Sequence, residues 1–283
     1  MEDDRRRFLK LILAGTVFSA GALVIAKSIP GSSSKSTTSE SNQQSTGKIE
    51  SIDDFHYPNP NDKNKAFGMI IDLEKCNGCE KIEGNEPDCV NACRVSHNVP
   101  PEMDWIKIFK KQDNPYQEPY FFPRICMQCE KPPCVEVCPV GAALRRHDGD
   151  GLVLIDHKRC IGCRLCMTAC PYETRYFNWD EYSEPRASLL KYDSPMFATN
   201  HIKGTTDKCD FCGHEGYMGH ISHCAAACNN GALYYGNLKE NLVTNSQGET
   251  LDVKKVLNER NGYRFKEELG THPRVYYLPR RSL

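Results

Sequence analysis

The sixteen cysteines of this 283-residue chain fall into four groups of four, with none left over. Every group opens with Cys-x2-Cys and closes with Cys-x3-Cys. The groups are Cys76, Cys79, Cys89 and Cys93; Cys126, Cys129, Cys134 and Cys138; Cys160, Cys163, Cys166 and Cys170; and Cys209, Cys212, Cys224 and Cys228. A cubane iron–sulfur cluster takes four cysteine thiolates. The sequence therefore predicts four [4Fe-4S] clusters and electron-transfer chemistry.

The third group has the most specific spacing, because it matches the bacterial ferredoxin run C-x2-C-x2-C-x3-C-P up to Pro171. Three close sulfurs on a tight loop can hold three irons of one cube. The fourth lies one helical turn further on, and in this pattern it binds the other cluster of a pair. The second group keeps the Cys-Pro ending, whereas the first and fourth carry insertions of nine and eleven residues before their final Cys-x3-Cys.

Two other uses of the cysteines remain open. Structural zinc also favours Cys-x2-Cys pairs, but zinc sites do not usually repeat a Cys-x3-Cys-Pro ending. A disulfide framework suits an exported chain with an even cysteine count. That class is usually small and denser in cysteine than sixteen in 283 residues. Iron–sulfur clusters are the favoured interpretation.

The first residues indicate the compartment. A basic stretch with paired arginines, Arg5 to Lys10, precedes an uncharged stretch from Leu11 to Ala26, which is short for a membrane span. The Arg-Arg-x-Phe-Leu-Lys run resembles a twin-arginine export signal. We expect residues 1–27 to be that signal and residues 28–65 a flexible Ser/Thr-rich linker. The chain would then act in the periplasm or at the outer face of the cytoplasmic membrane; an uncleaved anchor is the alternative.

The elements that must position the cysteines are short. The lead-in Ile-Asp-x3-Cys occurs twice, at Ile71 and Ile155. An apolar stretch long enough for one short strand precedes the aspartate each time, over residues 67–71 and 152–155. Short helices are expected inside the groups, where Cys-x3-Cys spans one turn. The other expected elements are a hairpin over 144–154, an irregular insertion over 180–208, a helix over 252–267 and a strand or extended tail over 275–278.

Composition excludes other classes. The net charge is −1, without long runs of one sign after the first residues, so the chain has no pattern for nucleic acid. Hydrophobic residues make up 39%, which is low for a core of this size. Cluster binding can supply the missing stability, because metal-binding free energy is also folding free energy.

The four groups, the repeated lead-in and the cubane spacing together resemble the iron–sulfur electron-transfer subunit of the dimethyl sulfoxide reductase family. The resemblance covers residues 66 to about 237, and Leu269 to Leu278 is similar to the family's C-terminal tail. It implies an α+β fold of two interleaved bacterial-ferredoxin-like modules within 66–240: an inner module at 126–170 and an outer one from 76–93 with 209–228. Residues 241–283 would form a C-terminal helix and extended tail.

The resemblance also implies crossed ligation within each pair of groups. The implied ligand sets are Cys126, Cys129, Cys134 and Cys170; Cys160, Cys163, Cys166 and Cys138; Cys76, Cys79, Cys89 and Cys228; and Cys209, Cys212, Cys224 and Cys93. Such subunits pass electrons between a membrane quinone-reactive subunit and a molybdopterin catalytic subunit. The alternative is a molybdenum-free complex that links quinone and cytochrome subunits, with a multihaem cytochrome as a partner.

No nucleophile–base pair or phosphate-binding loop stands out, so we expect no catalytic residue. A free-standing reductase would need an incompletely ligated iron, which sixteen cysteines do not leave. A purely structural metal protein would show no reducible signal. Two further segments are open to more than one interpretation. Residues 175–179 could pack in the core or dock a partner, and His214, His220 and His223 could bind metal or line their loop. Core packing and loop lining are favoured.

Overall fold

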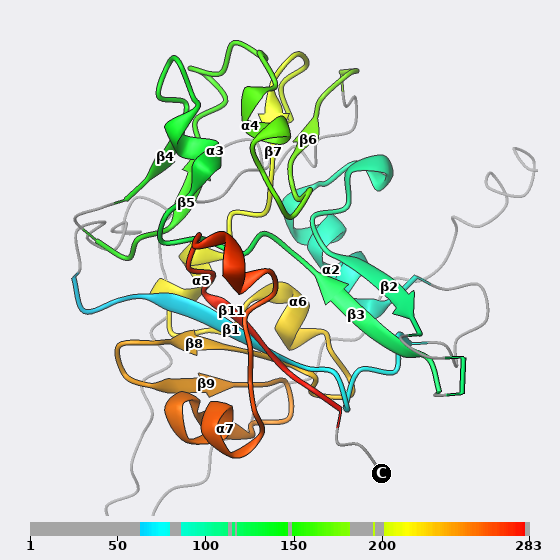
Figure 1. Ribbon diagram of the computed structural model, residues 1–283. Helices are drawn as coiled ribbons and strands as arrows, with labels where there is room; N and C mark the ends of the chain where they lie inside the picture. Colours follow the sequence, from blue (N-terminus) through cyan, green and yellow to red (C-terminus); the bar gives the residue numbers. More distant parts are fainter. Residues whose placement is uncertain are drawn as a thin grey trace, which may run out of the picture. The chain divides into compact units, whose positions relative to one another are not determined.

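The largest sheet has five strands in the order β10-β9-β8-β1-β11, with β1 (Phe67–Asp72) inside it (Figure 1). Its other strands are β8 (Leu233–Asn237), β9 (Leu242–Thr244), β10 (Thr250–Asp252) and β11 (Val275–Leu278). All six residues of β1 are buried; β8 pairs with it antiparallel on one edge and β11 parallel on the other, and its two faces pack into two separate hydrophobic clusters. A strand covered on both faces is a nearly continuous apolar run, here residues 67–71. The predicted strands at 67–71 and 275–278 are confirmed.

The structure is a computed structural model that describes residues 63–79, 86–112, 115–116, 118–146, 149–181, 195 and 201–280. All of them belong to one compact unit, Phe55–Leu283. The predicted export signal and all but the last three residues of the predicted linker lie outside the described residues.

Three two-stranded sheets accompany the large one. Their strands are β2 (Lys107–Lys111) with β3 (Tyr120–Arg124), β4 (Ala143–Arg145) with β5 (Val153–Ile155), and β6 (Tyr176–Phe177) with β7 (Thr206–Asp207). The β4–β5 pair is antiparallel, which confirms the hairpin predicted over 144–154. The irregular insertion predicted over 180–208 is wrong at its C-terminal end. There Thr206 and Asp207 pair with Phe177 and Tyr176, so the end of this stretch is tied to the chain after the third group.

The helices that carry cysteines are short, as predicted. Three are single turns of four residues, α3 (Pro133–Glu136), α4 (Leu165–Thr168) and α6 (His223–Ala226). In each, the third cysteine of the group is inside the turn and the fourth follows its end. The first group differs because α2 (Asp88–His97) has ten residues and contains both Cys89 and Cys93. No helix in the described ranges is long and apolar enough to cross a membrane.

The repeated lead-in folds the same way in both copies. Cys76 N donates to Asp72 O at 3.2 Å, and Cys160 N donates to Asp156 O at 3.1 Å. Each aspartate is also bonded through its own N–H to an alanine carbonyl, that of Ala232 or Ala142, at 2.8 Å. The sequence repeat is therefore a structural repeat: a strand, an aspartate turn and a cysteine loop, closed by an antiparallel partner strand.

The helix predicted over 252–267 is too long. Helix α7 is Val253–Glu259, with the Asp252 side chain accepting a hydrogen bond from Lys255 N at its start. It ends because Asn261 has a positive φ of 51°, which a continuing helix does not allow. A single 3-10 turn, η4 (Glu267–Leu269), follows. Two further short helical segments among the described residues are α5 (Gly213–Tyr217) and the 3-10 turn η2 (Pro101–Met103).

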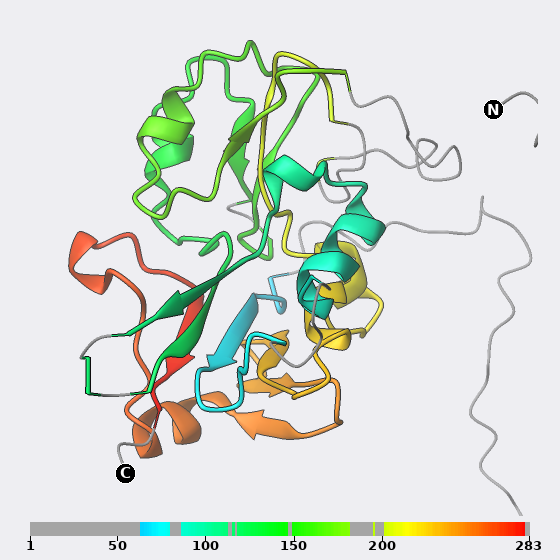
Figure 2. The same cartoon turned by 90° about the vertical axis from the view of Figure 1, so that its right-hand side faces the viewer.

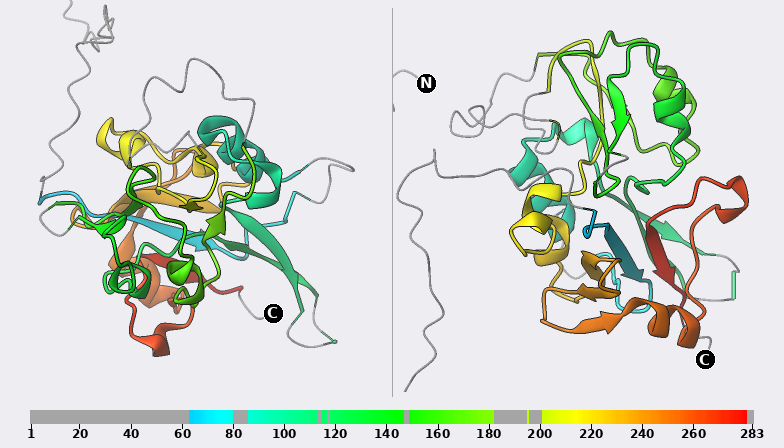
Figure 3. Two further views of the ribbon diagram at one scale, coloured as in Figure 1. Left: turned by 90° about the horizontal axis from the view of Figure 1, so that it is seen from above. Right: turned by 90° about the vertical axis from the view of Figure 1, so that its left-hand side faces the viewer.

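The fold is mixed α+β, as predicted. Helices α2 and α6 lie side by side in two perpendicular views, so the first and last cysteine groups meet in space (Figure 2, Figure 3). The main core joins side chains from both halves of the chain, including β1, β5, β8 and β11. These contacts place elements far apart in sequence next to one another, which is what a crossed set of thiols needs.

Candidate iron–sulfur sites

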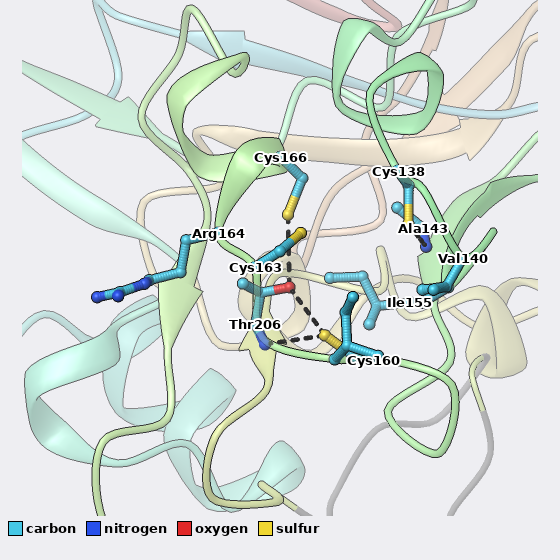
Figure 4. Close-up of a pocket in the computed structure, with 11 residues that line it drawn as sticks. Cys138, Val140, Ala143, Ile155, Cys160, Cys163, Arg164, Cys166 and Thr206 are labelled. Carbon is cyan, nitrogen blue, oxygen red and sulfur yellow. Dashed lines mark hydrogen bonds between the residues drawn. The ribbon is translucent and has the colours of Figure 1, made fainter.

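Four thiols surround a cavity beside the β4–β5 hairpin (Figure 4). They belong to Cys138, Cys160, Cys163 and Cys166. Thr206 lies between two of them, with its hydroxyl oxygen 3.6 Å from Cys160 Sγ and 3.4 Å from Cys166 Sγ. Its backbone N–H also donates to Cys160 Sγ at 3.5 Å. Three sulfurs thus come from the third group, and the fourth comes from the end of the second.

Backbone donors favour the thiolate form of Cys138. Burial pushes the pKa of this thiol upward, but the N–H groups of Ala143, Val140, Ala142 and Gly141 outweigh it and lower the pKa. The Ala143 N–H lies 3.3 Å from the sulfur. The same contact recurs in the other half, where Ala232 N donates to Cys228 Sγ at 3.3 Å. Cys138 and Cys228, each the last cysteine of its group, therefore both accept a hydrogen bond from a backbone N–H of the turn that follows them.

A second cavity is enclosed by the complementary four thiols. They belong to Cys126, Cys129, Cys134 and Cys170. Arg175 Nη2 donates to Cys134 Sγ at 3.0 Å, and the arginine is only 5% exposed. Burial raises the pKa of Cys134, and the Arg175 charge opposes that rise. Burial raises the pKa of Cys129 to about 12, although a hydrogen bond from the Thr271 side chain partly offsets it.

The first group meets the last cysteine of the fourth. After burial, the charges that raise the pKa of Cys89 most are those of Cys224, Cys228, Cys76 and Cys79. Burial raises the pKa of Cys76 to about 11, and the charges of Cys228 and Cys79 contribute to that rise. The thiols of Cys76, Cys79 and Cys89 therefore share one neighbourhood with Cys228.

The fourth neighbourhood contains Cys93, Cys209, Cys212 and Cys224. Burial raises the pKa of Cys93 first, followed by the charges of Cys209 and Cys224. His97, which is fully buried in α2, lies with Nε2 3.3 Å from Cys212 Sγ. The Phe211 N–H donates to Cys209 Sγ at 3.3 Å. Helix α2 thus supplies one thiol and one imidazole to the set completed by the fourth group.

Electrostatic interactions between thiols link neighbouring sets. After burial, the charge of Cys224 raises the pKa of Cys89 most, which links the two sets that the first and fourth groups share. After burial and the charge of Asp210, the charge of Cys126 raises the pKa of Cys209, which links these sets to those of the second and third groups. The side chain of Gln128, on the loop between Cys126 and Cys129, reinforces this junction, because it donates to Cys209 O at 3.2 Å and pairs with the backbone of β5.

The donor chemistry of each set fits a cubane cluster. Each set brings four cysteine sulfurs together, and all sixteen cysteines are free of disulfides. Burial raises the pKa of most of the buried thiols above its ordinary value. A bound cation such as iron offsets this desolvation penalty and stabilises the thiolates that it requires as ligands. When bound, a cluster supplies reversible one-electron chemistry. The protein supplies N–H, hydroxyl, imidazole and guanidinium donors to the sulfurs, which tune the potential.

Sequence reasoning misses several groups that touch sulfur. His97 stands isolated in the sequence and Thr206 lies in a stretch without pattern, so neither carries a signal. The stretch 175–179 divides: Arg175 is buried against Cys134, whereas Trp179 is 63% exposed and lies beneath the Arg164 guanidinium at 5.0 Å. Figure 4 shows Arg164 pointing away from the thiols of its own loop.

Comparison with known proteins identifies the class. Three models, each described as a 4Fe-4S dicluster domain, match residues 75–142, 117–186 and 152–229. The chain therefore binds 4Fe-4S clusters.

Curated relatives identify the family. A subunit of the selenate reductase of Mesobacillus selenatarsenatis is 39% identical over 226 residues, which are 74% of this chain and 70% of that protein. The menaquinone reductase iron–sulfur cluster-binding subunit of Nitratidesulfovibrio vulgaris is 33% identical over 246 residues, 76% and 89% of the two chains. A subunit of the tetrathionate reductase of Salmonella typhimurium is 32% identical over 218 residues, 75% and 72%. The chain belongs to the dimethyl sulfoxide reductase family of iron–sulfur electron-transfer subunits, and its role in a reductase complex is electron transfer without catalysis.

Proposed function

We propose that this subunit holds four [4Fe-4S] clusters with crossed ligation and relays single electrons along them. The observation that carries the proposal is the gathering of sixteen thiols into four sets of four, each set drawing its fourth sulfur from a different group. Two interleaved ferredoxin-like modules within residues 66–240 account for this pattern. In support, β1 precedes the first group and pairs with β8, which follows the last.

The clusters would form a line. We name each cluster by the cysteine that it takes from a second group. Along the line, the clusters are then those of Cys228, Cys93, Cys170 and Cys138. The neighbour relations of Cys89 with Cys224 and of Cys209 with Cys126 support the first two steps. The third is supported by Arg175, whose charge interacts with the thiols of Cys134, Cys166 and Cys126. Electrons would enter at one end and leave at the other.

Crossed ligation is tested by exchanging one closing cysteine at a time. Cys170→Ser should remove or alter the signal of the cluster bound by Cys126, Cys129 and Cys134. The cluster bound by Cys160, Cys163 and Cys166 should remain intact. Cys138→Ser is the matched variant with the reverse expectation. Electron paramagnetic resonance of the anaerobic, dithionite-reduced protein separates the two. If Cys170→Ser instead damages the cluster of Cys160, Cys163 and Cys166, ligation is not crossed.

We infer that the electron partners are a membrane quinone-reactive subunit and a molybdopterin catalytic subunit. The names of relatives support the quinone partner and a place in a reductase complex: one is a menaquinone reductase subunit, one a menaquinol oxidoreductase subunit, and others are subunits of selenate and tetrathionate reductases. The molybdopterin partner rests on the family resemblance. The alternative is a molybdenum-free complex with a multihaem cytochrome. The two quinone-named relatives favour a quinone partner in both versions.

The partner proposal is tested on the native complex. A tagged chain is isolated anaerobically from solubilised membranes, and molybdenum, haem and quinol-dependent cluster reduction are measured. Near-stoichiometric molybdenum and reduction by a menaquinol analogue support the first version. Haem without molybdenum favours the alternative, and the absence of any copurifying redox subunit contradicts both.

We propose export by the twin-arginine route, with residues 1–27 as the signal, residues 28–65 as the linker, and the periplasm or the outer face of the cytoplasmic membrane as the site of action. Replacing Arg5, Arg6 and Arg7 by Lys should hold the loaded protein in the cytoplasmic fraction. Export that continues unchanged would contradict the proposal.

A further inference from the structure

The eleven-residue gap between Cys212 and Cys224 carries a concentration of metal-binding side chains that the cysteine sets do not use. Helix α5 contains His214 and Glu215, the following loop contains His220, and α6 begins with His223. The side chains of His214, Glu215 and His223 are 12%, 15% and 28% exposed. They therefore lie just below the surface, and His223 is the most exposed of the three.

The three ligand atoms converge on one point. Glu215 Oε1 lies 3.4 Å from His214 Nε2 and 3.4 Å from His223 Nε2. All three donor atoms lie within 4.8 Å of one another. The second carboxylate oxygen, Oε2, is 2.8 Å from His220 Nδ1, which fixes the rotation of the carboxylate.

These distances match a tetrahedral zinc site. Ligand atoms about 2.0–2.1 Å from Zn²⁺ lie about 3.3–3.4 Å apart along a tetrahedral edge. Two edges already have that length, and the third needs a closure of at most about 1.4 Å between the two imidazoles. Two histidines and one carboxylate with an open fourth position form a known zinc donor set, and a hydrogen bond to the carboxylate is the usual support for its orientation.

A competing set nearby consists of His97, Cys212 and His223. It would take Cys212 away from the four thiols of its own neighbourhood, so it conflicts with the cysteine arrangement. The His214–Glu215–His223 set uses none of the sixteen thiols. Ring contacts connect the two regions, because the His97 ring centre lies 5.9 Å from that of His214 and 5.6 Å from that of His223.

We propose that His214, Glu215 and His223 bind one divalent transition-metal ion of the zinc type, with His220 orienting Glu215 and a water molecule filling the fourth position. The bound dication lies close to the cluster ligand Cys212, because a ring nitrogen of His223 lies within 4.8 Å of the Cys212 sulfur. Bound zinc therefore favours the reduced form of the adjacent cluster. This effect on the cluster rests on the proposed function, whereas the zinc site itself does not depend on it.

The test uses the full-length, cluster-loaded protein purified anaerobically. Equilibrium dialysis against buffered Zn²⁺, with metals counted by mass spectrometry, should give one zinc per chain above the iron. Zinc K-edge absorption should show only nitrogen and oxygen neighbours at about 2.0–2.1 Å and no sulfur near 2.3 Å. Glu215→Gln should weaken zinc binding at least tenfold. Glu259→Gln, an exposed carboxylate on α7, is the matched control and should leave it unchanged.

Iron and acid-labile sulfide are measured on every variant. If Glu215→Gln loses iron, His220→Gln replaces it, because its side chain is 66% exposed and its loss should still weaken zinc binding about tenfold. No bound zinc at saturation, sulfur in the zinc shell, or wild-type affinity in Glu215→Gln would overturn the proposal. Absence of iron with zinc held by nitrogen and oxygen would contradict the proposed function instead and leave this site standing.

Discussion

Replacing Arg175 by Gln should lower the reduction potential of the cluster that we propose at Cys126, Cys129, Cys134 and Cys170. Arg175 is 5% exposed, and its Nη2 donates to Cys134 Sγ at 3.0 Å. Burial alone would lower the pKa of this guanidinium, but the thiolates of Cys134, Cys166 and Cys126 outweigh it and raise the pKa. The arginine is therefore a fixed positive charge that stabilises the extra electron of the reduced cluster.

The magnitude follows from Coulomb's law. An electron added about 6 Å from the guanidinium interacts with it by roughly 2.8 kcal/mol at an effective dielectric constant of about 20. A tenfold change in a one-electron equilibrium is about 1.4 kcal/mol or 59 mV, so the loss is worth roughly 120 mV. Water that enters beside the shorter glutamine side chain restores part of the lost electrostatic stabilisation of the reduced cluster. We therefore expect the reduction potential to fall by about 100 mV.

The assay is a redox titration of the anaerobic protein followed by electron paramagnetic resonance. Arg175→Lys keeps the charge and should shift the potential by less than a third as much. Arg164→Gln makes the same chemical change on an exposed guanidinium, stacked on Phe177 at 5.0 Å, and should shift it by less than about 20 mV. A fully loaded Arg175→Gln protein with an unchanged or higher potential would refute the reasoning.

Two substitutions that leave all sixteen cysteines in place should reduce stability. Arg274→Met removes a buried guanidinium that donates to three backbone carbonyls at 2.6–2.9 Å, so the free energy of unfolding of the loaded protein should fall by about 3–5 kcal/mol in a denaturant titration. An effect below about 1 kcal/mol would contradict this reasoning. Gly162→Ala drives a Cβ into the carbonyl oxygen of Gly204 at a φ of +67° and should lower the Tm by about 5–10 °C. Gly141→Ala has a similar φ but open space, and equal losses in both would show that the contact does not matter.

The local elements could be predicted because short-range signals fix them. The apolar run before each Ile-Asp turn became β1 and β5, and two Asp-Gly steps gave the hairpin between β4 and β5. The helix after residue 252 could be predicted in its first two turns from Val253 and Val256, which are both buried. Its end also carried a local signal that the prediction missed, because Asn261-Gly262 is a step at which helices commonly stop, and Asn261 does adopt the left-handed conformation there.

The surroundings of the thiols depend on contacts between distant segments, so no short stretch of sequence carries a direct signal for them. Thr206 approaches Cys160 only because β7 pairs with β6 across an insertion. His97 reaches Cys212 only because α2 packs beside α6. The crossed sets were expected from family resemblance, and spacing alone did not decide which group supplies each fourth sulfur.

The most direct test of the account is the iron content and cluster type of the anaerobically purified full chain. We predict about sixteen irons and sixteen acid-labile sulfides per chain, with Mössbauer spectra of cubane clusters only. Chains that contain zinc or cystine in place of iron and sulfide would contradict the account.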